Sequence, residues 1–136
     1  MRKAITYGAL IGRLTFGAWF AFNGILYWTP YLPGAYNPVP VRFLEALMES
    51  GVMRLVKIVE LTVGLALLAN FFVPLALVIG FPVTVIIAYN DLVLEYPIAF
   101  SMTGGALTFA VHAFLLFAYF DYYRPLLTRK ARVGRA

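Results

Sequence analysis

Four ionisable side chains lie within stretches of sequence that are otherwise apolar, and their types make them the best candidates for chemistry. They are Arg13, Lys57, Glu60 and His112. Lys57 and Glu60 are three residues apart, so on a helix they share one face and can pair. A charge inside a membrane is costly and needs a partner or a function, and a histidine can exchange a proton near neutral pH. We therefore treat these four residues as a candidate polar or ligand site.

Two interpretations of this candidate site stay open. Helical rise places Arg13 roughly 10 Å from the cytoplasmic end of the first predicted span. It places Glu60 roughly 13 Å from the outer end of the second predicted span. In a membrane core about 30 Å thick, the two are expected to lie near enough in height to pair. Such a pair would either only join two helices or belong to a ligand or proton site. Lys57 has the further options of reaching the surface or pairing with Glu60 or Asp91, and His112 is either a hydrogen-bonded packing residue or a proton carrier.

A second polar group is expected nearer the outer surface of the membrane. It contains Asn23, Tyr89, Asn90 and Asp91. The chain has no cysteine, which excludes disulfides, thiolate metal sites and thiol redox chemistry, and one histidine is too few for a histidine metal site. Phosphate-binding loops, dinucleotide fingerprints and nucleophile elbows are absent from the sequence. We assign no catalytic residue, no metal ligand and no resident cofactor, and a quinone remains a candidate ligand.

The composition indicates that these residues are held in a membrane. Of 136 residues, 62% are hydrophobic and only 12% are charged, and the mean hydropathy is +0.84. Soluble domains have about 25% charged residues. The net charge of +5 comes largely from the two ends of the chain, which is typical of the segments that orient a membrane protein and not of a nucleic-acid-binding surface. The basic residues at the ends are Arg2, Lys3, Arg124, Arg129, Lys130, Arg132 and Arg135.

The pattern of apolar runs predicts an all-α, polytopic membrane protein with one domain, residues 1–136. Four transmembrane helices are expected in an antiparallel bundle, because each run approaches the roughly 20 residues that a bilayer requires. The predicted spans are residues 5–28, 52–70, 74–94 and 98–119, followed by a basic cytoplasmic tail at 121–136. Both termini are expected in the cytoplasm, with the chain in a bacterial-type cytoplasmic (inner) membrane.

A short amphipathic helix is predicted between the first two spans, at residues 41–50. Its apolar side chains fall on one helical face, which suits a helix at the membrane surface. They are Phe43, Leu44, Leu47 and Met48. Gly51 is expected to end this helix, Pro74 to lie in the first turn of the third span, and Pro82 to bend that span.

Small residues recur at helical spacing in the first span. Ala4, Gly8 and Gly12 form one series, and Gly17 and Ala21 form another. Residues of this size let membrane helices approach closely, so we expect both series to pack against neighbouring helices.

Taken in order, several segments resemble the DoxX family of small four-helix membrane proteins, and the similarity covers nearly the whole chain. The most specific is Lys57-Ile-Val-Glu60 followed by Gly64. The others are Arg13-Leu14, Phe22-Asn-Gly24, Phe72-Val-Pro74 and Asp121-Tyr-Tyr-Arg124-Pro125. The resemblance implies four membrane helices and a quinone-linked or redox-accessory role, with Arg13, Lys57 and Glu60 as the core of the site.

Three functions are weighed on this basis. The first is a small subunit or accessory of a larger membrane complex, linked to redox chemistry or to quinone and not catalytic on its own. The second is a purely structural subunit that packs against other membrane proteins at the edge of an assembly. The third, a transporter component, would need dimerisation because four spans are few for a transport pathway.

Overall fold

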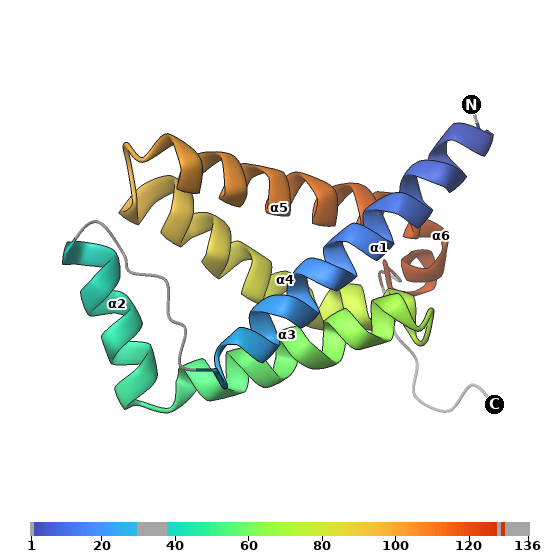
Figure 1. Cartoon of the computed structure of the whole chain (residues 1–136). Helices are drawn as coiled ribbons and strands as arrows, with labels where there is room; N and C mark the ends of the chain where they lie inside the picture. Colours follow the sequence, from blue (N-terminus) through green and yellow to red (C-terminus); the bar gives the residue numbers. More distant parts are fainter. Residues whose placement is uncertain (1, 30–37, 128, 130–136) are drawn as a thin grey trace.

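Helices account for nearly all of the chain that the structure describes, as the composition predicts. The structure, a computed structural model, describes residues 2–29, 38–127 and 129 (Figure 1). In this part of the chain the α-helices are α1 (Arg2–Leu26), α2 (Pro38–Glu49), α3 (Val52–Leu68), α4 (Val73–Tyr89), α5 (Ala99–Ala118) and α6 (Phe120–Tyr123). A π-helical turn, η1 (Asn90–Leu94), continues α4, and a 3-10 turn, η2 (Arg124–Leu127), follows α6.

Three of the helices are long and apolar enough to cross a membrane, judged by length and composition. They comprise Lys3–Leu26, Val73–Leu94 and Ala99–Ala118. Helix α3, which corresponds to the predicted span at 52–70, is shorter, with 17 residues, and carries Arg54, Lys57 and Glu60. Large apolar side chains cover the outside of the molecule, and Phe100 is 89% exposed. A soluble protein rarely exposes so much apolar surface, whereas lipid solvates it well.

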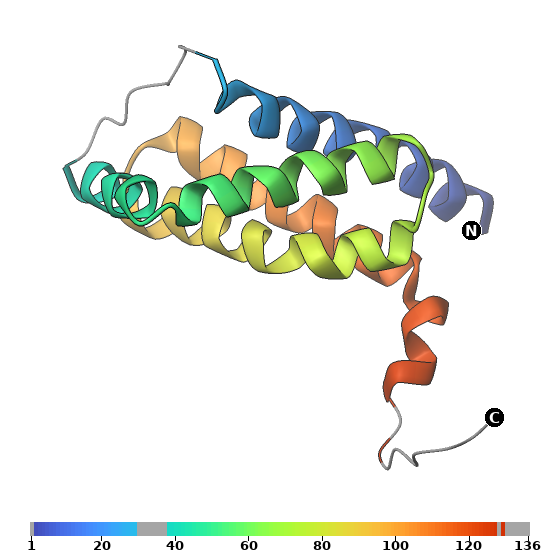
Figure 2. The ribbon, with the colours of Figure 1, turned by 90° about the horizontal axis from the view of Figure 1, so that it is seen from below.

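The long helices form an antiparallel ring in which α1 contacts α3, α3 contacts α4, α4 contacts α5, and α5 contacts α1 again (Figures 1 and 2). The core lies inside this ring. Its buried members are Phe16, Phe20, Val63, Leu67, Val73, Ala76, Leu77, Val83 and Leu115. The start of α1 and the short helix α6 lie at one end of the ring, and α2 lies at the other.

The predicted amphipathic helix is present as α2 and packs against α3 and η1. Phe43, Leu44 and Leu47 are half-buried, as their shared face predicts, whereas Met48 is exposed. Gly51 has a left-handed backbone with φ of 78°, and its amide donates to the Met48 carbonyl. The glycine therefore ends α2, because few other residues adopt this conformation without strain.

A turn of four residues joins α3 to α4 and is built as a Schellman motif. Asn70 has φ of 56°, its amide donates to the Leu67 carbonyl, and the Phe71 amide donates to the Ala66 carbonyl. This pair of bonds is the usual way to satisfy the last carbonyls of a helix. Pro74 lies in the first turn of α4, as predicted, where its missing amide costs nothing.

The two series of small residues in α1 contact two different helices. A side chain at Gly8 or Gly12 would meet Phe114 or Leu115 of α5. One added at Gly17 would lie 3.1 Å from the Gly64 carbonyl oxygen of α3. The helix is thus packed against α5 along its first half and against α3 along its second half, which confirms the predicted packing role of Gly8, Gly12, Gly17 and Ala21. Ala4, the first member of the series, is exposed.

The chain turns away from the ring after α5, which ends at Ala118 (Figure 2). The Tyr123 hydroxyl donates to the Pro74 carbonyl at 3.0 Å and so ties α6 to the start of α4. Partial burial raises the pKa of Tyr123 to about 12, and nearby Tyr119 adds to the shift, so the hydroxyl keeps its proton at neutral pH. Of the predicted tail at 121–136, residues 128 and 130–136 lie outside the described residues, as do residues 30–37 of the long loop.

We expect Gly64→Ala to lower the free energy of unfolding by about 2 kcal/mol, because a methyl group there would strike the α1 backbone at Ala21 and Gly17. Unfolding of the protein in mixed micelles, followed by circular dichroism during an SDS titration, measures this change. The matched control is Gly104→Ala, whose methyl group would come no nearer than 4.0 Å to Asp91 and should not destabilise the protein. Equal stability of the two variants would contradict the close contact of α1 with α3.

Candidate functional site

Lys57 and Glu60 form an ion pair on α3. The Lys57 Nζ lies 2.7 Å from Glu60 Oε2, and no other salt bridge occurs within the described residues. Glu60 is 1% exposed, whereas the Lys57 side chain is 19% exposed. Of the two partners considered for Lys57, the structure therefore selects Glu60. A carboxylate at this depth requires such a cation, because burial of an unpaired charge is strongly unfavourable.

The predicted pairing of Arg13 with Glu60 is not formed. Arg13 instead donates from Nη1 to the Asn70 side-chain oxygen, in the turn after α3. The reason is the register of the two helices: Gly24 lies against Leu61, so Glu60 is level with the far end of α1. The prediction took both helices to start at the membrane edge. In the structure the residues of α1 that precede Arg13 extend past the end of α3, so Arg13 is level with the turn after α3 and not with Glu60.

Asn70 has two roles in this turn. Its left-handed backbone ends α3, and its side chain accepts the hydrogen bond from Arg13. Arg13 is 8% exposed, and its Nε has no hydrogen-bond partner within the described residues. The guanidinium is thus held by a neutral amide, which leaves its positive charge uncompensated by this contact.

His112 is completely buried at the centre of the ring and makes two hydrogen bonds. Its Nδ1 lies 2.6 Å from the Thr84 hydroxyl, and its Nε2 lies 2.9 Å from the Leu77 carbonyl oxygen of α4. Because a carbonyl only accepts, Nε2 carries a proton, and in the neutral ring Nδ1 accepts from Thr84. Phe16 and Phe81 pack against the imidazole in edge-to-face geometry, with ring centroids 4.6 and 5.5 Å away.

These contacts correspond to the packing interpretation of His112. Both ring nitrogens are occupied by α4, so the side chain joins α5 to α4 through hydrogen bonds rather than facing an open space. Such bonds stabilise a membrane bundle, because the alternative is a polar group without a partner in hydrocarbon. Groups of three or more metal-ligating side chains do not occur in the described part of the chain.

The second polar group is brought together only in part. The Asn90 amide donates to Asp91 Oδ1 and to Glu95 Oε1, each at 3.1 Å, and Ser101 donates to the other Glu95 oxygen. Asn23 instead bonds to the Trp19 carbonyl of its own helix, and Tyr89 is 54% exposed. Asn23 and Tyr89 are thus not part of the cluster that Asn90 and Asp91 form, contrary to the prediction from sequence.

The π-helical turn gives this group its shape. A π turn holds one residue more than an α turn, which shifts the side chains that follow it and is frequent at functional sites. Here the Glu95 amide donates to the Asn90 carbonyl at 2.9 Å. Asp91 fits closely over α5, since a side chain at Gly105 would lie 2.5 Å from its Cβ. The group therefore joins the end of α4 to the start of α5.

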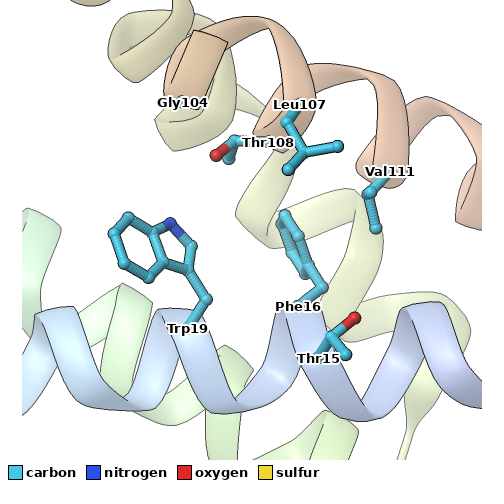
Figure 3. Close-up of a pocket in the computed structure, with 7 residues that line it drawn as sticks. All are labelled: Thr15, Phe16, Trp19, Gly104, Leu107, Thr108 and Val111. Carbon is cyan, nitrogen blue, oxygen red and sulfur yellow. The ribbon is translucent and has the colours of Figure 1, made fainter. Parts of the chain in front are cut away.

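A groove runs between α1 and α5 and has a volume of about 270 Å³ (Figure 3). Its lining is almost entirely apolar and consists of Thr15, Phe16, Trp19, Gly104, Leu107, Thr108 and Val111. The Trp19 nitrogen and the Thr108 oxygen are turned toward the space between the helices. Neither atom makes a hydrogen bond within the described residues, whereas the Thr15 hydroxyl bonds to the carbonyls of Ile11 and Gly12. A second apolar groove of about 320 Å³ lies between α3 and α4.

Sequence reasoning overlooked several residues that complete these contacts. They are Asn70, Thr84, Glu95 and Ser101, together with Trp19 and Thr108 in the groove. A signal was available for Asn70, because asparagine is the residue after glycine most often found at a left-handed helix end. For Thr84 there was none, since a threonine in an apolar span usually bonds to its own helix.

Comparison of the chain with known proteins finds no matching family model, no similar curated protein and no similar solved structure.

We expect Thr84 and His112 to be energetically coupled by about 1 kcal/mol, in the direction that stabilises the folded chain, because they share a buried hydrogen bond. A double-mutant cycle with Thr84→Val and His112→Phe, unfolded in SDS, measures this coupling. The control cycle pairs His112→Phe with Thr103→Val, since Thr103 bonds only to the Ala99 carbonyl of its own helix and should show no coupling. Additive effects in the first cycle would contradict the assigned bond.

Proposed function

We propose that the chain is a DoxX-like, four-span membrane protein that serves as a small subunit or accessory of a larger, quinone-linked redox assembly. Its own part would be to hold the head group of a quinone in the groove between α1 and α5. The proposal includes a fourth span, α3, and both termini on the cytoplasmic side of a bacterial-type inner membrane. Each of these parts rests on a separate observation.

The assignment of α3 as a span is supported by its place in the ring. Helix α3 lies between α1 and α4, both of which are long and apolar enough to cross a membrane. Its 17 residues extend about 26 Å, close to the thickness of the hydrocarbon core. The charges that lower its hydropathy are accommodated, because Glu60 is buried and paired with Lys57, and Arg54 lies in the first turn, where it can reach the surface.

The orientation follows from charge. The start of α1, which contains Lys3, lies at the same end of the ring as α6 (Figure 1). Arg124 directly follows α6, and Arg129 comes two residues after η2. Basic residues beside membrane spans favour the cytoplasmic side. The loop with α2 and the turn with Asp91 and Glu95 would then face outward.

The groove between α1 and α5 is the observation that carries the quinone proposal. A quinone head group needs an apolar slot and a few hydrogen-bond donors for its carbonyl oxygens. The groove supplies apolar walls, and Trp19 and Thr108 supply an N–H and an O–H directed into it (Figure 3). Trp19 lies about 10 Å inside the end of α1. A tryptophan N–H at that depth has no water to donate to, so a hydrogen bond to a ligand would be favourable.

The original candidate residues do not themselves surround this slot. Lys57 and Glu60 satisfy each other, and both nitrogens of His112 are bonded to α4. Phe16 separates His112 from the groove and contacts its ring. Electrons would therefore come from a partner subunit, and this chain would position the quinone rather than reduce it.

A purely structural subunit is the second candidate function. The specific observation in its favour is that Lys57, Glu60 and His112 already have partners within the bundle. The exposed apolar side chains of α5, such as Phe100 and Phe117, suit contact with other subunits as well as with lipid. A transporter receives no comparable support, because the buried polar groups lie in separate clusters without a described hydrophilic path between them.

Quinone binding is testable through Trp19, because the chain has only two tryptophans. In the Trp28→Phe variant, decylubiquinone should quench Trp19 fluorescence saturably in detergent. Thr108→Val in the same background should raise the half-saturating concentration about fivefold, since one hydrogen bond is lost. Thr103→Val, on the same helix but bonded to its own backbone, should leave it unchanged.

The reciprocal variant, Trp19→Phe, retains Trp28 and reports only the partitioning of quinone into the micelle. Its quenching should be weak and linear with concentration. Linear quenching of Trp19 that Thr108→Val does not alter would refute the quinone proposal and leave the structural subunit as the better account.

A further inference from the structure

A third pocket, distinct from the two grooves described above and not used by the quinone proposal, lies at the end of the ring near the described termini. It has a volume of about 330 Å³. Its lining residues are Ile5, Thr6, Ala9, Leu10, Arg13, Ala118 and Tyr119. The pocket exists because α3 ends at Leu68, whereas α1 continues past the α3–α4 turn and leaves its inner face uncovered there (Figure 1). We call this pocket the terminal recess.

Arg13 gives the terminal recess a buried positive charge. The side chain is 8% exposed and lines the pocket. Its one hydrogen bond assigned within the described residues goes to the neutral Asn70 side chain, and its Nε is buried without a partner there. The single salt bridge of the described chain joins Lys57 and Glu60, so no described carboxylate neutralises the guanidinium. Burial of a cation without an anion is unfavourable by several kcal/mol, which an anionic ligand would offset.

The surroundings of the recess favour an anion that carries apolar chains. Lys3, Arg124 and Arg129 are exposed at the same end of the molecule, and Asp121 is the described acidic residue in the short helix there. Most of the recess wall is aliphatic, from Ile5, Ala9, Leu10 and Ala118. Basic pockets between membrane helices on the cytoplasmic side are typical binding places for anionic lipid head groups. A guanidinium fits phosphate oxygens well, because its N–H groups form a planar fork.

We propose that the terminal recess binds a phosphate group, with Arg13 as the principal donor. The aliphatic wall makes an anionic phospholipid of the adjacent leaflet the expected source, and free inorganic phosphate is the other. The ligand would share Arg13 with Asn70 and would join the overhanging part of α1 to the end of α5. This site is separate from the α1–α5 groove, so it stands or falls independently of quinone binding.

The test is native mass spectrometry of the delipidated full chain with phosphatidylglycerol, phosphatidylcholine or inorganic phosphate added separately. The wild-type chain should retain one phosphatidylglycerol with about tenfold higher affinity than phosphatidylcholine. Arg13→Gln should abolish this preference, whereas Lys3→Gln, which removes one exposed charge at the same end, should keep it. Saturable binding of inorganic phosphate that also depends on Arg13 would identify a soluble anion as the source.

Asn70→Asp provides a second variant that does not remove the arginine. The new carboxylate would pair with Arg13, so the lipid-free protein should melt at a higher temperature and the preference for phosphatidylglycerol should fall. Circular dichroism confirms that each variant is folded before its binding is compared. A preference for phosphatidylglycerol that persists in folded Arg13→Gln or Asn70→Asp, or a wild-type chain without any preference, would overturn the proposal.

Discussion

The close contact between α1 and α3 determines which polar side chains meet inside the bundle. Gly17 and Gly64 let the two backbones touch, and this contact fixes their relative height. At that height Arg13 lies beside Asn70, and Leu61 lies beside Gly24. Glu60 is therefore too far along α1 to reach Arg13, and it pairs with Lys57 one turn away on its own helix. In a membrane, where water cannot satisfy a stranded group, this register assigns a partner to each of these side chains.

The helices could be predicted from sequence because their signals are local. Apolar runs, Gly51 and Pro74 mark helix ends that agree with the structure within a few residues. The π-helical turn at Asn90–Leu94 could not be predicted, since it depends on how Asp91 fits over Gly105 of α5. The terminal recess could not be predicted either. It forms because α3 is short and leaves part of α1 uncovered, and no pattern in the sequence indicates this.

The polar contacts were predictable only where both partners belong to one helix. Lys57 and Glu60 satisfy that condition, because a spacing of three residues places them together in any α-helix. Arg13 with Asn70 and His112 with Thr84 join different helices, so their pairing depends on register and rotation, which composition and spacing do not specify. The two buried side chains His112 and Arg13 thus differ in how fully their hydrogen-bonding groups are satisfied. His112 has its nitrogens occupied, and Arg13 has a donor without a described partner.

The central claim is that α3 crosses the membrane between α1 and α4, with the buried Glu60 paired to Lys57. The chain contains no cysteine, so single cysteines introduced by Ser50→Cys and Phe71→Cys, at opposite ends of α3, can be labelled without background. In sealed vesicles of known orientation, a membrane-impermeant maleimide should label one of the two positions at once and the other only after permeabilisation. Immediate labelling of both positions from the same side would show that α3 does not span the membrane and would contradict the account.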